Sequence, residues 1–301
     1  MNAIEVNNLK KKYNDNYVVK GVSFNVKAGE IFGFLGKNGA GKTTTINMLS
    51  GIIRPTEGAF CIMGQTHTRM DMIKSQIGVM PDAANYYYEM TALNHLVFFS
   101  ELKNAKVKQD QLIHILERVG LSGHERKKVK GFSFGMKKKL GIAQALIGDP
   151  KLIFLDEPTS GLDPESVVEI QQLIQELNAQ HKTIFLTSHN LHEVEKLCSR
   201  IVIMEQGLIT KYGSMDELKK QYQQHIELFL KIGPVPAANV QSMRQELSQY
   251  CTDLMFEESE LTCSVSNEEH IPRIVYTLAK RDIDIYKVVP KQVTLEDIFF
   301  G

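Results

Sequence analysis

A glycine-rich segment between an apolar strand and a helix has the spacing of a phosphate-binding loop. Gly36, four further residues, Gly41, Lys42 and Thr43 follow a strand predicted at 30–35. Glycines let successive backbone N–H groups turn inward around phosphate oxygens, at the positive end of the following helix. Lys42 is expected to hold the β- and γ-phosphates, and Thr43 to offer its hydroxyl to Mg²⁺. The residues expected to bind nucleotide phosphates are Asn38, Gly39, Ala40, Gly41, Lys42, Thr43 and Thr44.

Two adjacent carboxylates end a second apolar strand, predicted at 151–155. Ligands of open α/β sheets bind at the carboxyl ends of the strands. Asp156 is expected to position Mg²⁺ through water, and Glu157, on the opposite side, to act as the general base that polarises an attacking water. An acidic pair after a strand often only begins a loop, but the nearby phosphate loop favours the catalytic interpretation.

The apolar pattern places both motifs in an α/β fold. Strands predicted at 151–155 and 183–186 bracket a helix with apolar residues at helical spacing, which is a βαβ crossover and implies parallel strands. Residues 85–150 are predicted to form a helical insertion. A hairpin is expected around Gln206 and Gly207, followed by a polar helix at 214–224.

The pattern changes near residue 222, where we place a domain boundary between 1–222 and 223–301. Beyond it, short strands and helices follow in the order βαββαβ, which predicts a small α+β domain of ferredoxin-like fold. The four predicted strands are 226–232, 254–257, 261–265 and 283–289.

The composition describes a folded chain of 301 residues, 43% of them apolar, with zero net charge. This balance gives no field that attracts nucleic acid, so no nucleic-acid partner is expected. No apolar run approaches the roughly 20 residues of a membrane-spanning helix, and Met1–Tyr13 lacks a signal-peptide core. The four scattered cysteines favour free thiols in a reducing cytosol, with Cys263 packed in a core. The lysine-rich segments 127–130 and 137–139 are interpreted as solvated faces.

The order of these motifs resembles that of the ATP-binding subunits of ABC transporters, over roughly residues 1–220. The run Leu-Asp-Glu-Pro-Thr-Ser-Gly-Leu-Asp at 155–163 is similar to the family's joined Walker B motif and D-loop, and Ser188-His189 to its switch histidine. Residues 131–136 resemble its signature loop, in which Ser133 and Gly135 match the usual Leu-Ser-Gly-Gly-Gln. The positions that depart from it are Phe132, Phe134 and Met136.

The resemblance implies a P-loop NTPase fold of ABC-ATPase type and a head-to-tail dimer that encloses two ATP molecules with Mg²⁺. Ser133 and Gly135 would complete the partner's site, and His189 would hydrogen-bond the γ-phosphate. Tyr13 fits the aromatic residue that stacks on adenine, with Val18 beneath the same ring, although an edge-strand tyrosine is the plain alternative. Asp82 stands where the family usually has glutamine, and is expected to accept a water bound to Mg²⁺.

The resemblance also implies the function: a transport-coupled ATPase subunit, in a homodimer or beside a paralogous subunit, that drives export through separate transmembrane permease subunits. Such a subunit lies at the cytoplasmic face of the membrane. Tyr86, Tyr87 and Tyr88 are candidates for the cleft that receives the permease, or for core packing. The segment after residue 222 resembles the tails of ABC-2 type exporter ATPases and is expected to stabilise the dimer or to regulate it. The alternative is an ATP-dependent switch or regulatory clamp with little hydrolysis.

Overall fold

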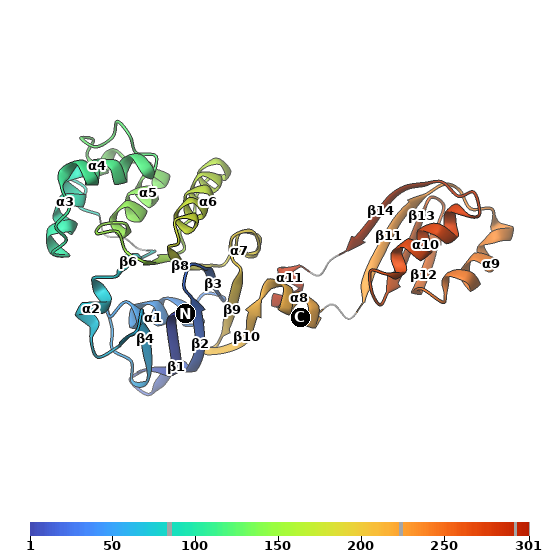
Figure 1. Ribbon diagram of the computed structural model, residues 1–301, viewed down its shortest axis with the longest axis horizontal. Coiled ribbons are helices and arrows are strands. Elements are labelled where there is room, and N and C mark those ends of the chain that lie inside the picture. The colour runs from blue at the N-terminus through green and yellow to red at the C-terminus, as the bar shows by residue number, and fades with distance from the viewer. Residues whose placement is uncertain (83–85, 223–224, 292–293, 301) are drawn as a thin grey trace. The chain divides into compact units, whose positions relative to one another are not determined.

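The computed structural model describes residues 1–82, 86–222, 225–291 and 294–300 (Figure 1). The chain divides into two compact units, Met1–Met215 and Asp216–Gly301. This division falls at the start of helix α8 (Met215–Tyr222), whereas the change in sequence pattern lies at its end. No helix within the described ranges is both long and apolar enough to cross a bilayer.

The first unit is built on a six-stranded sheet of order β10-β9-β3-β8-β7-β6. All neighbouring strands are parallel except β10, which forms a hairpin with β9 around Gln206 and Gly207. Strands β7 and β8 are joined through helix α6 (Pro164–Ala179), which confirms the predicted βαβ crossover. The strands are β3 (Ile31–Leu35), β6 (Ile77–Met80), β7 (Leu152–Asp156), β8 (Thr183–Ser188), β9 (Arg200–Glu205) and β10 (Leu208–Ser214).

Every residue of β3, β7 and β8 is buried, as expected for parallel strands covered on both faces. Phenylalanines from these strands form the centre of the core: Phe185 lies 5.6 Å from Phe32 and 5.3 Å from Phe154, between ring centroids. Phe24, from the neighbouring antiparallel sheet, stacks on Phe32 at 5.8 Å. One hydrophobic core therefore joins both sheets and fixes the strand ends that carry the functional motifs.

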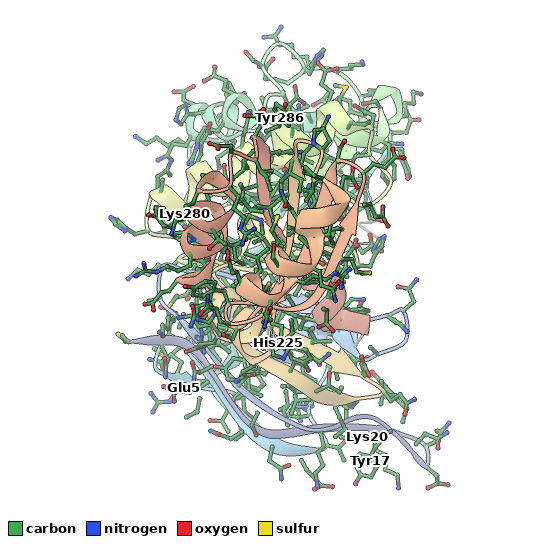
Figure 2. All side chains as sticks on the ribbon, turned by 90° about the vertical axis from the view of Figure 1, so that its right-hand side faces the viewer. Glu5, Tyr17, Lys20, His225, Lys280 and Tyr286 are labelled. Carbon is green, nitrogen blue, oxygen red and sulfur yellow. The ribbon has the colours of Figure 1, made fainter. Side chains whose placement is uncertain are left out.

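The second sheet of this unit is antiparallel, in the order β2-β1-β4-β5. One face packs on the core and the other meets water, where Glu5, Tyr17 and Lys20 are exposed (Figure 2). The apolar pattern of the sequence predicts a strand at 22–26, which is only part of β2, and none of the other three strands. The strands are β1 (Asn2–Tyr13), β2 (Asn16–Lys27), β4 (Glu57–Ile62) and β5 (Gln65–Thr66), followed by helix α2 (Met70–Lys74).

Residues 86–150 form the predicted helical insertion, with Thr91 and Ser133 capping the first and last helix through their hydroxyl oxygens. Helix α5 crosses directly over β6, because a Cβ atom on Gly78 would lie 1.9 Å from the carbonyl oxygen of Ala145. Only glycine permits this approach. The helical elements are α3 (Ala92–Leu102), α4 (Gln109–Arg118), a 3₁₀ turn (Val129–Gly131) and α5 (Phe134–Ala145).

Residues 226–291 of the second unit form an antiparallel sheet of order β12-β13-β11-β14 with helices α9 and α10 in the chain order βαββαβ, which confirms the predicted ferredoxin-like fold. Cys263 packs in its core, 4% exposed, as expected. Helix α11 (Leu295–Phe300) was not predicted, and it buries Leu295 and Ile298. The remaining elements are β11 (Ile226–Ile232), α9 (Ala237–Leu247), β12 (Thr252–Glu257), β13 (Glu260–Val265), α10 (His270–Ala279) and β14 (Ile285–Lys291).

Candidate nucleotide-binding and hydrolysis site

The glycine-rich loop lies between β3 and helix α1 (Lys42–Leu49) and has little freedom to change. Gly39 and Gly41 adopt the left-handed backbone conformation, with φ of 82° and 108°. A Cβ atom on Gly41 would lie 3.0 Å from the carbonyl oxygen of Val18, and one on Gly36 would lie 2.4 Å from that of Met204. The backbone of β2 and β9 therefore holds the loop in the shape that its glycines permit.

The loop borders a cavity of about 190 Å³ that also receives two carboxylates from distant parts of the chain. Asp82 follows the end of β6, and Glu157 follows the end of β7. The sheet brings these residues to the loop because β6, β7 and β3 all end at the same edge. The cavity is lined by Val18, Lys37, Asn38, Gly39, Ala40, Gly41, Lys42, Thr43, Thr44, Asp82 and Glu157.

The Lys42 ammonium is held inside this loop. Its side chain is 7% exposed, and Nζ donates a hydrogen bond to the carbonyl oxygen of Gly36 at 2.6 Å. The same nitrogen lies 3.7 Å from Glu157 Oε1. A buried cation thus faces a partly buried carboxylate across the cavity.

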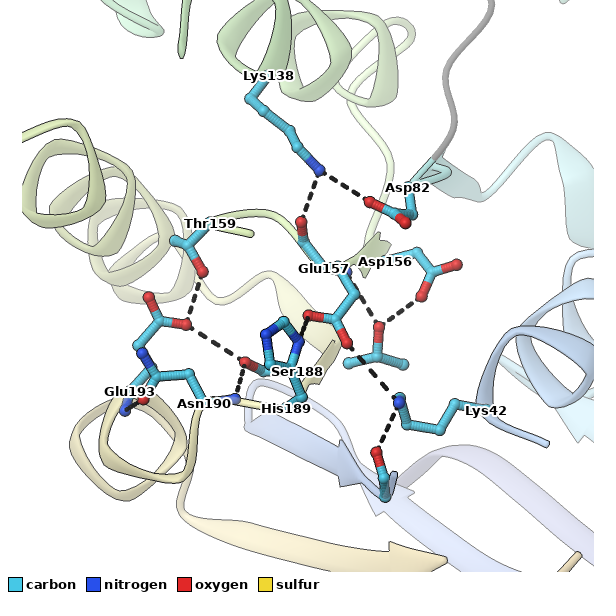
Figure 3. Close-up of polar contacts among 12 residues, drawn as sticks. Lys42, Asp82, Lys138, Asp156, Glu157, Thr159, Ser188, His189, Asn190 and Glu193 are labelled. Atoms are coloured by element: carbon cyan, nitrogen blue, oxygen red, sulfur yellow. Dashed lines mark hydrogen bonds and ion pairs between the residues drawn. The ribbon is translucent and has the colours of Figure 1, made fainter. Parts of the chain in front are cut away.

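Glu157 lies between Lys42 and His189 (Figure 3). Its Oε2 atom is 2.8 Å from Nδ1 of His189, the first residue after β8, and its side chain is 12% exposed. Asp156 points elsewhere: it is 2% exposed and accepts a hydrogen bond of 2.5 Å from Thr187 Oγ1. The Glu157 N–H group donates to the same hydroxyl oxygen at 3.0 Å. Thr187 therefore orients both acidic residues.

The interpretation of residues 137–139 as a solvated face is wrong for Lys138. Its side chain projects from α5 into the site and is 5% exposed. Its Nζ atom lies 3.1 Å from Asp82 Oδ1 and donates a hydrogen bond of 2.7 Å to the carbonyl oxygen of Glu157. Three consecutive lysines carry no periodic signal that distinguishes the buried one, so the sequence did not reveal this contact.

Another buried carboxylate, missed from the sequence, joins the segment after Glu157 to the end of β8, just before His189. Glu193, on helix α7 (Leu191–Leu197), is 5% exposed. Its Oε2 atom accepts hydrogen bonds from Thr159 Oγ1 at 2.6 Å and from Ser188 Oγ at 3.3 Å. The segment after Glu157 and the segment before His189 are thereby fixed to one side chain.

Replacing Thr159 with valine is expected to lower the free energy of unfolding of the first unit by about 1.5–3 kcal/mol, the usual contribution of a hydrogen bond to a charged group. Valine keeps the shape of threonine but leaves the Glu193 carboxylate without its shortest donor. Urea denaturation measures the effect. Thr159→Ser, which keeps the hydroxyl, is the matched control, and equal stability of the two variants would contradict the assigned contact.

The expected signature-loop residues lie outside this cavity. Ser133 is exposed at the N-terminus of α5, where its Oγ atom accepts a hydrogen bond from the N–H group of Met136 at 3.2 Å. Neither Ser133 nor Gly135 is among the residues that line the cavity within the described part of the chain. Tyr13 also lies outside the lining, 46% exposed at the end of β1, while Val18 is part of it.

The three consecutive tyrosines have two different environments. The Tyr86 hydroxyl donates to the carbonyl oxygen of Lys137 at 2.6 Å, and burial raises the pKa of Tyr86 well above its ordinary value. Tyr87 and Tyr88 are 46% and 51% exposed. Tyr86 is therefore packed inside the unit, whereas Tyr87 and Tyr88 form an exposed aromatic surface.

The oxygen donors of the site suit a magnesium ion bound together with phosphates. Mg²⁺ is usually held by one or two protein oxygens, with water and substrate phosphate completing its shell. Thr43, Asp82 and Glu157 carry such oxygens along the cavity, whereas the buried Asp156, held by Thr187, is not among its lining residues. Among the described residues, no three His, Cys, Asp or Glu side chains cluster as a self-sufficient metal site.

Comparison with known proteins agrees with this geometry. A family model described as "ABC transporter" matches residues 19–160. The bacitracin transport ATP-binding protein BcrA of Bacillus licheniformis is 41% identical over 234 residues, which cover 75% of this chain and 74% of BcrA. The linearmycin resistance ATP-binding protein LnrL of Bacillus subtilis is 32% identical, with coverage of 99% and 97%.

A solved structure, a dimeric bacterial ABC transporter cassette, matches with a TM-score of 0.65 and 25% identity, over 70% of this chain and 98% of the cassette. The predicted P-loop fold of ABC-ATPase type is therefore confirmed. The length and identity of the match to BcrA and LnrL extend this likeness from fold to family. The chain belongs to the ATP-binding subunits of ABC transporters, the proteins that bind and hydrolyse ATP for these machines.

Proposed function

We propose that this chain powers an exporter by closing, as a dimer, on two ATP molecules with Mg²⁺ and driving separate transmembrane permease subunits. The observation that carries the proposal is the cavity in which Lys42 Nζ and Glu157 Oε1 face each other at 3.7 Å beside the phosphate loop. The relatives named for bacitracin transport and linearmycin resistance support the export direction. In this role the chain lies at the cytoplasmic face of the membrane, attached through the permease.

In the proposed reaction, water attacks the γ-phosphorus in line, the bond to the bridging oxygen breaks, and ADP leaves. Lys42 and the loop N–H groups, with Thr44, hold the phosphates. Glu157 accepts the proton from the attacking water. With Nδ1 of His189 against Glu157, Nε2 is left to face a γ-phosphate oxygen, and it donates a hydrogen bond there when the ring is protonated.

Mg²⁺ would be held by the Thr43 hydroxyl and, through water, by Asp156, with Asp82 as a further oxygen donor. When bound, it would neutralise charge on the β- and γ-phosphate oxygens. Lys138 contacts the Oδ1 atom of Asp82, so the other oxygen of this half-exposed carboxylate is available to this shell without breaking that contact.

We assign the adenine to Tyr13 and Val18. Val18, on β2, lines the cavity. Tyr13 ends the neighbouring strand β1, and its exposed ring can stack on a base. The exposed Tyr87 and Tyr88 are assigned to the surface that meets the permease.

The second half of each ATP site would come from the other subunit. Ser133 and Gly135 stand at the exposed start of the 12-residue helix α5, where unpaired N–H groups attract phosphate oxygens. They do not line the cavity of their own chain, which supports a role on a partner's nucleotide.

Mixing two inactive variants tests this arrangement. Lys42→Ala disables the phosphate loop and Ser133→Ala the signature loop, so each variant alone is expected to hydrolyse ATP poorly. In a mixed dimer, one site combines the intact Lys42 of one subunit with the intact Ser133 of the other. Random mixing should then recover up to about a quarter of the normal turnover, because half of the dimers have one intact site of two.

The comparison is made by steady-state ATPase assay at equal total protein. If the mixture hydrolyses ATP no faster than the mean of the two variants, the shared site is wrong. If Ser133→Ala alone has normal turnover, Ser133 has no part in hydrolysis.

A further inference from the structure

A single buried cation connects three elements around the candidate site. Lys138 lies in the second turn of α5, and its side chain is 5% exposed. Its ammonium lies 3.1 Å from the Asp82 carboxylate, after β6, and donates at 2.7 Å to the main-chain carbonyl oxygen of Glu157, after β7 (Figure 3). A buried ammonium needs such partners, since an unpaired charge is unfavourable away from water.

The hydrogen bond from Lys138 is accepted by Glu157, a residue with an unfavourable backbone conformation. Glu157 has a φ of 50°, in the left-handed region that side chains other than glycine rarely adopt. Its N–H group is held by Thr187 Oγ1 at 3.0 Å, and its carbonyl oxygen is held by Lys138 at 2.7 Å. The two hydrogen bonds fix the backbone on both sides of the side chain that faces Lys42 and His189. A strained residue persists where the surrounding structure determines it in this way.

The two partners of Lys138 differ in what they contribute. Asp82 is 55% exposed and retains contact with water, so it serves mainly to neutralise the ammonium. The Glu157 carbonyl has the shorter contact and is part of the backbone that sets the direction of the carboxylate. Ser133 caps the same helix, five residues before Lys138, so the Lys138 side chain connects the helix with the exposed Ser133 end to the Glu157 backbone.

We propose that Lys138 is a positioning residue for hydrolysis: it holds the Glu157 backbone so that the carboxylate stays aligned with the attacking water, and it ties this alignment to helix α5. The inference rests on the proposed role of Glu157 as the general base. Lys138 itself touches neither water nor phosphate in this scheme. Its removal should therefore affect the chemical step and not the binding of ATP.

Three variants of the full chain test the proposal. Lys138→Met has a similar length but no charge and no donor, whereas Lys138→Arg keeps both. Lys139→Met is the matched control, because Lys139 is the next residue of α5 and pairs with Glu169 at 2.8 Å, away from Glu157. For each variant, kcat and KM for MgATP, the Kd of a fluorescent ATP analogue and the melting temperature are measured.

Lys138→Met is expected to lower kcat by about 10- to 100-fold, the usual effect of a misplacement of about 1 Å, and to leave Kd within about twofold. Lys138→Arg should recover most of kcat, and Lys139→Met should keep it. The proposal is overturned by normal kcat in Lys138→Met. It is equally overturned if kcat and melting temperature fall while Kd rises, and arginine restores none of them, because the role is then purely structural.

Two further variants keep the result decisive. If Lys138→Met does not fold, Lys138→Gln replaces it: its side chain is one atom shorter and loses the reach to Glu157, so kcat should fall at unchanged Kd, and a normal kcat overturns the proposal. Glu157→Gln is assayed alongside. Normal turnover in Glu157→Gln refutes the general base itself, whereas lost turnover there with normal turnover in Lys138→Met refutes only the role of Lys138.

Discussion

Glu157→Gln is expected to bind ATP as the unchanged chain does and to hydrolyse it about 10²- to 10⁴-fold more slowly, the usual contribution of a general base. Glutamine has the shape of glutamate and can still meet His189 Nδ1, which lies 2.8 Å from the Glu157 carboxylate. Its amide cannot accept the proton of the attacking water. The phosphate loop and Lys42 are untouched, so the affinity for nucleotide should persist.

Slow hydrolysis should also change the assembly of the protein. In the proposed cycle the dimer opens after ATP is cleaved, so Glu157→Gln should accumulate as an ATP-bound dimer. Light scattering in MgATP measures this, beside the steady-state ATPase rate of the same samples. Normal turnover would remove Glu157 from the mechanism. ATP-driven dimers of both forms without turnover in either would instead favour a switch, or a motor that is silent without its permease.

Lys42→Ala should greatly weaken the binding of ATP, the step that precedes hydrolysis. The Lys42 side chain is 7% exposed, and its Nζ donates a hydrogen bond to the carbonyl oxygen of Gly36, in the same loop. When ATP binds, Nζ can donate to phosphate oxygens instead, and the backbone of the loop need not move. Truncating one partner of a buried, hydrogen-bonded charge pair costs about 2–5 kcal/mol, which corresponds to a rise of about 30-fold to several thousand-fold in Kd.

Removal of Lys42 has a second consequence, because Glu157 Oε1 loses the cation that lies 3.7 Å away. Repulsion between this carboxylate and the γ-phosphate then adds to the loss of attraction. Titration with a fluorescent ATP analogue measures the change. Lys20→Ala, which removes an exposed lysine of β2, is the control for net charge, and equal affinities of the two variants would contradict the assignment of Lys42.

The elements that position the site could be predicted from the sequence where all residues of a strand are buried or where a motif has short, fixed spacing. Strands β3, β7 and β8 are fully buried and read as short apolar runs, and each ends in residues of a recognisable motif. The helices of 86–150 and the alternating strands of the second unit follow their expected periods. These features depend on local sequence, so the sequence alone was sufficient to find them.

Strand β1 shows why other elements were missed. Its burial does not alternate regularly, because the pairing with β2 shifts between Val6 and Leu9, where Asn8 has a φ of 46°. The bulge exchanges the two faces within the strand, and the three lysines after it, Lys10, Lys11 and Lys12, are all partly exposed. A pattern of period two is lost in such a strand. Helix α11, of only six residues, is too short to show a period.

The supporting contacts of the site were hidden for a different reason. Glu193 and Lys138 are charged residues on helices, and charged helical residues are usually exposed. Their burial depends on hydroxyl, carbonyl and carboxylate groups from segments that are far apart in sequence, such as Thr159 for Glu193 and Asp82 for Lys138. Sequence motifs identify the groups proposed to touch ATP, whereas the residues that aim those groups emerge only from the fold.

The small size of the cavity at the phosphate loop has a pharmacological consequence. Pockets that enclose a drug-sized molecule usually measure about 300–1,000 Å³, whereas this one measures about 190 Å³. The cavity on one chain therefore encloses only the phosphate end of a ligand, while the exposed Tyr13 leaves the adenine end open to solvent. In the proposed dimer, an inhibitor gains both tight binding and selectivity by reaching across to the opposing signature loop. Phe134, which departs from the usual motif there and is 55% exposed, offers such a compound an aromatic contact.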